Sequence, residues 1–214
     1  MRIKIAALAI GIALWTAPAW AGTINFTQGY SGQQGTQITY TLDGATITAY
    51  GYQEGYSGNS PTDLYVKTSG GDESGLGINY ENDHEIDTSQ FIQLNLSNLA
   101  NLGITSGDLS IGSVQSGEGY AIYDSNKVGS LGSLQLTGTL DETPFSISWS
   151  ATDPIIGVTA YVPKGGNYDA DVLLMSLSTH NDPTPEPASL ALMGTGLLAL
   201  AYGYRRYSKV SLAK

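Results

Sequence analysis

Polar and apolar residues alternate along the middle of the chain with the period of two that is typical of β-strands. The clearest example is a pair of runs, 37–42 and 45–50, joined by Asp43-Gly44, a dipeptide that favours a two-residue hairpin turn. This turn fixes the register of the predicted hairpin, in which the cross-strand pairs are Leu42–Ala45, Tyr40–Ile47 and Ile38–Ala49. We expect the face with these six residues to be buried, whereas the opposite face carries Gln37, Thr39, Thr41, Thr46, Thr48 and Tyr50.

Ten further short segments have the composition of strands and are separated by turns rich in Gly, Asn, Asp and Pro. They are residues 24–27, 63–68, 76–80, 91–96, 108–115, 119–123, 133–140, 145–149, 155–162 and 172–178. Only residues 97–102 favour a short helical turn. This succession of short strands predicts an all-β fold over residues 22–180, an antiparallel β-sandwich of the jelly-roll-like kind.

The N-terminus has the parts of a secretory signal peptide. Two basic residues precede an apolar run at 5–15, and Ala19 and Ala21 give the small-x-small pattern of a cleavage site. We therefore expect residues 1–21 to be removed, so that the mature chain begins at Gly22.

Residues 188–204 form an uncharged, predominantly apolar run near the C-terminus. A helix of this length spans roughly 25 Å, slightly less than the ~30 Å hydrocarbon core, and the tyrosines and arginines at its end compensate for the difference. A buried core helix is the alternative, but such a helix should have a polar face, which this run lacks. We predict a transmembrane helix at 188–204, a polar linker at 181–184 and a basic tail at 205–214 that remains cytoplasmic.

Pro185-Glu186-Pro187 lies immediately before this run, and Arg205 and Arg206 close it. In this order, the elements within residues 185–210 resemble the PEP-CTERM sorting signal of Gram-negative bacteria. The resemblance implies recognition by an exosortase, a membrane enzyme that would cut near Pro-Glu-Pro and release the protein or transfer it to the cell surface. It also implies a species that makes exopolysaccharide, and a protein anchored only transiently in the inner membrane.

The region between the two terminal signals is strongly acidic. From Gly22 to Pro185 it contains 18 acidic residues against three lysines, a net charge of −15, while the whole chain has a net charge of −10. This charge argues against nucleic acid or anionic lipid as a partner and favours cations. The chain contains no cysteine, which excludes both a disulfide framework and a thiolate nucleophile.

The densest group of acidic residues contains Glu81, Asp83, Glu85 and Asp87 at alternate positions. In an extended segment the four side chains lie on one side, and Ca²⁺ needs six to eight oxygen ligands of this kind. The pattern therefore indicates a calcium site, with a solvated acidic loop as the alternative. Residues 167–171 show a similar alternation with less support.

A second candidate site consists of Tyr50, Tyr52 and Tyr56, which lie among glycines in a short stretch. Exposed aromatic rings at these positions would suit glycan binding, because they stack on flat sugar faces. The alternative is ordinary packing, since tyrosine is favoured in strands.

Nothing in the sequence selects a catalytic group. It has no G-x-S-x-G motif, and its two histidines, His84 and His180, lack a second nearby His or Cys and are predicted to be surface residues. We therefore expect a non-enzymatic surface or matrix protein with a structural or adhesive role associated with exopolysaccharide or biofilm. A carbohydrate-binding module and, less favoured, a secreted hydrolase with two carboxylates are the alternatives.

Overall fold

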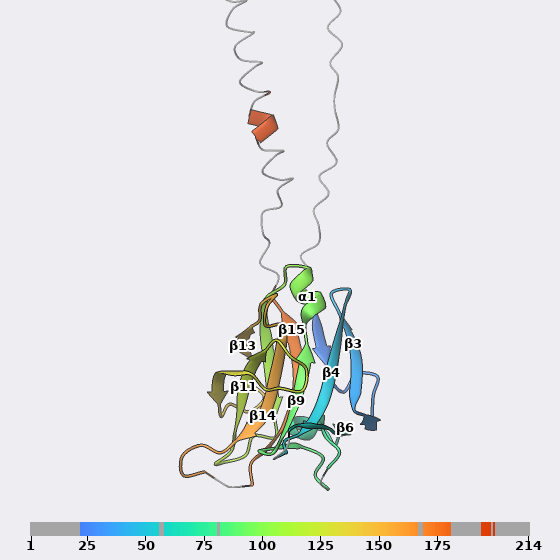
Figure 1. Cartoon of the computed structure of the whole chain (residues 1–214), viewed down its shortest axis with the longest axis vertical. Coiled ribbons are helices and arrows are strands. Elements are labelled where there is room, and N and C mark those ends of the chain that lie inside the picture. Colours follow the sequence, from blue (N-terminus) through green and yellow to red (C-terminus); the bar gives the residue numbers. More distant parts are fainter. Residues whose placement is uncertain are drawn as a thin grey trace, which may run out of the picture.

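Two antiparallel sheets pack face to face as a sandwich (Figure 1). The computed structural model describes residues 22–55, 58–80, 82–166, 169–180, 194–197 and 199. In spatial order, the first sheet contains β13 (Phe145–Ser148), β10 (Ser106–Gly112), β15 (Asp171–Thr179), β7 (Ser74–Ile78), β6 (Leu64–Thr68) and β2 (Gly32–Gly35), with β1 (Thr23–Asn25) and β8 (Ile86–Asp87) also paired to β15. The second sheet contains β12 (Ser133–Gly138), β11 (Gly119–Ser125), β14 (Ile155–Tyr161), β9 (Gln90–Asn95), β4 (Ala45–Gln53) and β3 (Gln37–Leu42), with β5 (Ser60–Pro61) paired to β4.

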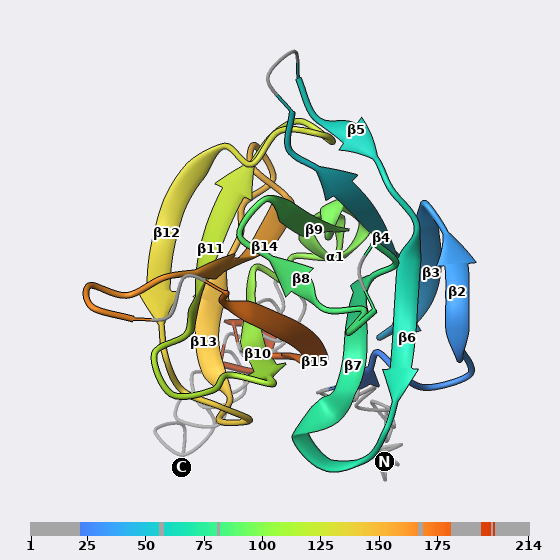
Figure 2. The same cartoon turned by 90° about the horizontal axis from the view of Figure 1, so that it is seen from below.

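The chain crosses repeatedly from one sheet to the other. It does so between β2 and β3, between β5 and β6, at each step from β8 to β11, and at each step from β12 to β15. The last two strands take central positions, β14 between β11 and β9, and β15 between β10 and β7 (Figure 2). This arrangement confirms the predicted all-β sandwich, and β15 is the central strand that leads out of it.

The predicted hairpin forms with the predicted register. Leu42 pairs with Ala45, Tyr40 with Ile47 and Ile38 with Ala49, and all six residues are buried. Asp43 and Gly44 have φ angles of 51° and 76°, as a two-residue turn with two left-handed residues requires. The short helix α1 (Ser97–Asn101) also lies where the sequence indicates one.

Each of the ten other predicted strands is present, with ends that differ by a few residues. Three strands and one 3-10 helix were not predicted: β2, β5, β8 and η1 (Gly71–Glu73). Their sequences are too short to show alternation, as in the Ile86-Asp87 pair of β8, or polar throughout, as in Gly-Gln-Gln-Gly of β2. These three strands are extended because their backbone groups hydrogen-bond to a longer neighbouring strand, and their own sequences do not show that neighbour.

Strand β8 enters the first sheet beside β15 at one end of the sandwich. Strands β7 and β15 share a single residue pair, Leu76–Leu174, and beyond it β8 pairs with β15 through Ile86 and Val172. On its other side, the backbone N–H of Ile78 donates to the carbonyl of Glu85 at 3.4 Å. Because Ile86 is fully buried, this short strand closes the core at that end.

The approach to β8 depends on two glycines in β7. The side chains of Leu76 and Ile78 belong to the core, so Gly75 and Gly77 lie on the opposite face of the strand, which therefore carries no side chains at these two positions. A Cβ added at Gly77 would lie only 2.0 Å from the carbonyl oxygen of His84. Residues 82–89, which we call the 82–89 segment, can therefore lie directly on the backbone of β7.

A second segment, residues 126–132, covers the outer face of the second sheet. Gln93 of β9 is fully buried beneath it, donates from Nε2 to the carbonyl of Ser130 at 2.6 Å, and accepts from the N–H of Gly129 at 2.7 Å. At Gly157 of β14, an added Cβ would lie 2.9 Å from Cδ2 of Leu131. This 126–132 segment therefore shields the centre of the second sheet from solvent.

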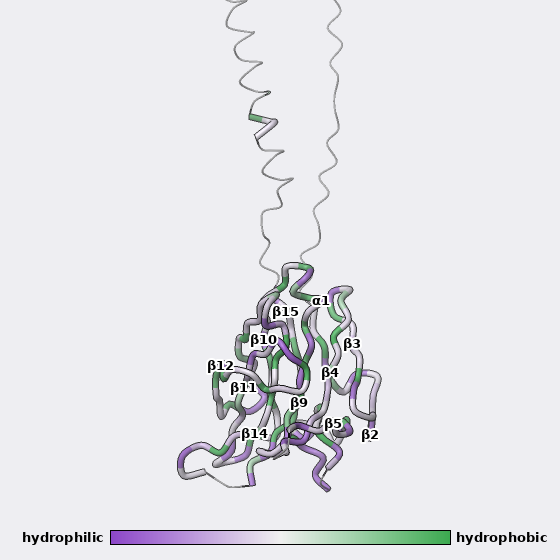
Figure 3. Tube along the Cα trace, in the orientation of Figure 1, coloured by the Kyte–Doolittle hydropathy of each residue, from purple (hydrophilic) through white to green (hydrophobic). Residues whose placement is uncertain are grey.

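Both ends of the sandwich domain meet at the same end of the molecule (Figure 1). The N–H of Thr179 donates to the carbonyl of Gly22 at 3.1 Å, and the N–H of Gly22 donates to Oγ1 of Thr179 at 3.3 Å. Asp171 lies at the other end of β15, roughly 27 Å away at the usual rise per residue. The loops at that far end are largely hydrophilic (purple in Figure 3).

The predicted terminal signals lie mostly outside the described residues. This applies to the signal peptide with Ala19 and Ala21, the linker, Pro185-Glu186-Pro187, and Arg205 and Arg206. Within the predicted membrane helix, residues 194–197 and 199 are helical. No helix within the described ranges is long and apolar enough to cross a membrane.

The contact between β7 and the 82–89 segment makes a prediction about stability. Gly77→Ala should lower the free energy of unfolding by about 1–3 kcal/mol, because its methyl group meets a backbone carbonyl that cannot move without distorting the segment. The measurement is urea unfolding of the full chain in detergent. Gly157→Ala is the matched control and should change stability by less than about 1 kcal/mol, since its one close contact is with the flexible end of Leu131. Equal losses in the two variants would contradict this account.

Candidate functional site

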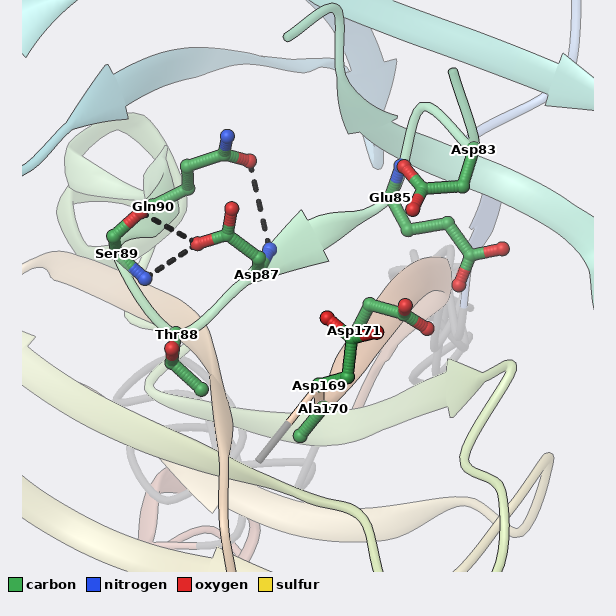
Figure 4. A pocket seen from close by; sticks show the side chains of 9 residues that line it. All are labelled: Asp83, Glu85, Asp87, Thr88, Ser89, Gln90, Asp169, Ala170 and Asp171. Carbon is green, nitrogen blue, oxygen red and sulfur yellow. Dashed lines mark hydrogen bonds between the residues drawn. The ribbon is translucent and has the colours of Figure 1, made fainter. Parts of the chain in front are cut away.

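An acidic pocket of about 150 Å³ lies at the far end of the sandwich, between the 82–89 segment and the start of β15 (Figure 4). It is lined by Asp83, Glu85, Asp87, Thr88, Ser89, Gln90, Asp169, Ala170 and Asp171. The two acidic patterns noted in the sequence thus contribute to one pocket. The pairing of β8 with β15, which places Asp87 opposite Asp171, brings them together.

Glu85 is the buried member of this group. Its side chain is 4% exposed, and its Oε1 forms an ion pair with Nζ of Lys67. Its other carboxylate oxygen, Oε2, is buried without a hydrogen-bond partner. The carboxylates of Glu85 and Asp171 point toward one another (Figure 4). The pocket therefore contains one fixed, desolvated carboxylate oxygen whose bonding capacity is unused.

Lys67 holds Glu85 in place from the outer face of β6. Its ammonium also pairs with Glu73, whose Oε1 accepts a hydrogen bond from Oγ of Ser113 at 3.3 Å. Burial acts to lower the pKa of Lys67, but the bonds to both carboxylates outweigh it and raise that pKa. The same bond from Lys67 lowers the pKa of Glu73. The pairing of Lys67 with Glu85 was not predicted from the sequence, although Lys67 is one of only three lysines between Gly22 and Pro185.

The carboxyl group of Asp171 lies in a partly buried position among other carboxylates, where its ionised form is disfavoured. Burial, followed by the neighbouring carboxylate of Glu85 and the charges of Glu118 and Asp83, raises the pKa of Asp171 to about 8. Burial also raises the pKa of Glu118, which is 5% exposed, and the charges of Glu85 and Asp169 add to that effect.

The predicted calcium ligands have unequal roles in the structure. Asp83 and Asp87 line the pocket with Glu85, whereas Glu81 lies outside the described residues. Oδ1 of Asp87 accepts hydrogen bonds from the N–H and the hydroxyl of Ser89, so this oxygen shapes the turn before β9. Among the residues that the structure describes, no three acidic, His or Cys side chains are grouped closely enough to hold a metal ion as they stand. Calcium binding therefore remains a prediction.

The two histidines differ from one another. His180 is exposed, as predicted, and its Nε2 lies 2.7 Å from Oδ2 of Asp108. His84 is half-buried rather than exposed, because its ring stacks on Tyr65 with centroids 3.8 Å apart. The backbone of His84 has a φ of 61°, and its contact with Gly77 brings the ring over β6.

The predicted exposed face of tyrosines is wrong at Tyr52. This residue is 8% exposed and its ring stacks on Phe91 with centroids 5.1 Å apart. Gly129 in the 126–132 segment lies over the Tyr52 ring, so a position that alternation assigns to solvent is covered by a distant loop. Tyr50 is half-buried, and Tyr56 lies outside the described residues. The structure therefore does not provide the expected platform at Tyr52.

Comparison with known proteins identifies the C-terminal signal. Residues 183–206 match the PEP-CTERM protein-sorting motif, which marks the chain as an exosortase substrate and implies export to the cell surface. This match confirms the predicted PEP-CTERM sorting signal, while the transmembrane helix at 188–204 and the cytoplasmic tail stay predictions. No curated protein and no solved structure matches the chain.

The raised pKa of Asp171 predicts how stability depends on pH. The carboxyl group ionises near 3.8 when unfolded and at about 8 when folded, so its contribution to stability is complete at low pH and is lost as pH rises between those values. In the presence of a chelator, Asp171→Asn should therefore show a shallower decline in the free energy of unfolding between about pH 4 and pH 8 than the unsubstituted protein.

The measurement is urea unfolding of the full chain at a series of pH values. Glu142→Gln, which removes an exposed carboxylate outside the pocket, is the control and should keep the steeper decline. Parallel profiles for the Asp171→Asn variant and the unsubstituted protein would show that Asp171 is not protonated in the folded state.

Proposed function

We propose that the processed protein is a non-enzymatic structural or adhesive component of the cell surface or extracellular matrix, associated with exopolysaccharide. The observation that carries this proposal is the direction of β15. This central strand runs from the acidic pocket to Thr179, after which the chain leads to the sorting motif. A protein held at the surface through its C-terminal end would present the opposite end, with its polar loops and its pocket, away from the cell.

The charge of the domain supports an extracellular role. A net charge of −15 between Gly22 and Pro185 keeps copies of the domain apart and soluble. It also repels anionic polymers, so a neutral polysaccharide, or an anionic one bridged by cations, is the compatible partner.

Processing is tested by replacing Pro185, Glu186 and Pro187 together with alanine. The unsubstituted protein recovered from the surface or the medium should begin at Gly22 and end near Pro185-Glu186-Pro187, as measured by intact mass. The variant should remain uncleaved in the membrane fraction, because the exosortase no longer recognises it. Asn181→Ala with Asp182→Ala, outside the matched residues, is the control and should be processed normally. Normal processing of the triple variant would overturn the assignment of the motif.

The structural role is tested separately by varying the amount of protein in a deletion strain. Surface attachment and matrix cohesion should be lost on deletion and should return in proportion to the protein present, because a structural component acts stoichiometrically. Full recovery at a small fraction of the normal amount would instead indicate a catalyst. Unchanged attachment in the deletion strain would reject the adhesive role and leave the sorting result intact.

A further inference from the structure

We propose that the pocket between the 82–89 segment and β15 binds a divalent cation, specifically Ca²⁺, through Glu85 and Asp171 with the neighbouring carboxylates of Asp83 and Asp169. This inference does not depend on the proposed surface role. It assigns a different ligand set from the sequence pattern, since half of these carboxylates come from a second segment some eighty residues along the chain.

The unused oxygen of Glu85 is the first argument. A carboxylate that is 4% exposed would normally have every oxygen bonded, yet no group in the described part of the chain bonds to Oε2, and Glu85 lines the cavity. Lys67 pairs with Oε1 and so fixes the direction of Oε2. A cation in the pocket would supply the missing partner without disturbing that ion pair.

The balance of charge is the second argument. Five carboxylates line the pocket, and Lys67, the cation nearest to Glu85, already pairs with two carboxylates. Glu85 and Asp171 point toward one another and repel when both are ionised. A divalent cation between them would replace this repulsion with two attractions.

The chemistry of the lining selects the cation. Every polar lining side chain other than the amide nitrogen of Gln90 presents oxygen, the chain has no cysteine, and the ring of His84 is stacked on Tyr65. Oxygen-only sites favour hard cations, and Ca²⁺ accepts six to eight ligands in flexible geometry, whereas Mg²⁺ demands a strict octahedron. A cavity of about 150 Å³ has room for the ion and for the waters that complete its shell.

The flexible members of the site can supply the remaining ligands. Asp83 and Asp169 are exposed, so their side chains can rotate toward an ion held by the fixed Glu85. This explains why the carboxylates line one cavity without being grouped around a common point. Binding would draw the two segments together.

The test compares thermal unfolding of the full chain in detergent, by calorimetry, in 10 mM CaCl₂, in 10 mM MgCl₂ and in chelator. Extracellular calcium modules have dissociation constants of roughly 10⁻⁴–10⁻³ M, so Ca²⁺ should raise the melting temperature by roughly 3–10 °C. Asp171→Asn should remove most of this increase, and Asp169→Asn should reduce it, while Glu142→Gln should leave it unchanged. The two Asn substitutions keep the side-chain volume and remove a negative charge, so both variants should fold.

Two results would overturn the proposal. The first is a melting temperature that does not respond to Ca²⁺. The second is a response that Mg²⁺ reproduces in full or that survives in both Asn variants, since this would reflect general screening of the acidic surface.

Discussion

The close contact between the backbone of Gly77 in β7 and the carbonyl of His84 is the constraint on which the far end of the structure depends. Only glycine at position 77 leaves room for it. With the 82–89 segment packed against β7, the ring of His84 stacks on Tyr65 and Glu85 forms an ion pair with Lys67. Strand β8 then pairs with β15 in the first sheet. The pocket is a consequence of this path, because its two acidic segments meet through β8.

A shortage of positive charge is the second constraint. Burying Glu85 without a partner would be strongly unfavourable, and Lys67 makes that burial possible. Burial raises the pKa of Asp171 and of Glu118, neighbouring carboxylates add to the effect, and the same lysine does not offset it. The fold thus retains a local excess of negative charge at one end, where structural stability alone would favour its removal.

The sequence predicted the fold better than it predicted the site, for a physical reason. The Asp43-Gly44 turn and the alternation around it depend on neighbouring residues only, so the hairpin and its register followed from local rules. Tyr52 obeyed the same alternation, yet Gly129 lies over it after a separation of 77 positions, and no local pattern carries that information. Strand β8 was missed for a similar reason, since Ile86 and Asp87 are extended only because β15 is beside them.

The candidate site shows both the value and the limit of spacing arguments. Asp83, Glu85 and Asp87, which alternate in the sequence, line one pocket in the structure. Spacing could not indicate that Asp171 would face Glu85, because their proximity requires the completed sheet. The site therefore exists only in the folded domain, and β8 joins β15 through just two residue pairs. Any ligand held between Glu85 and Asp171 would add to this short connection, so binding would stabilise the folded arrangement of the far end.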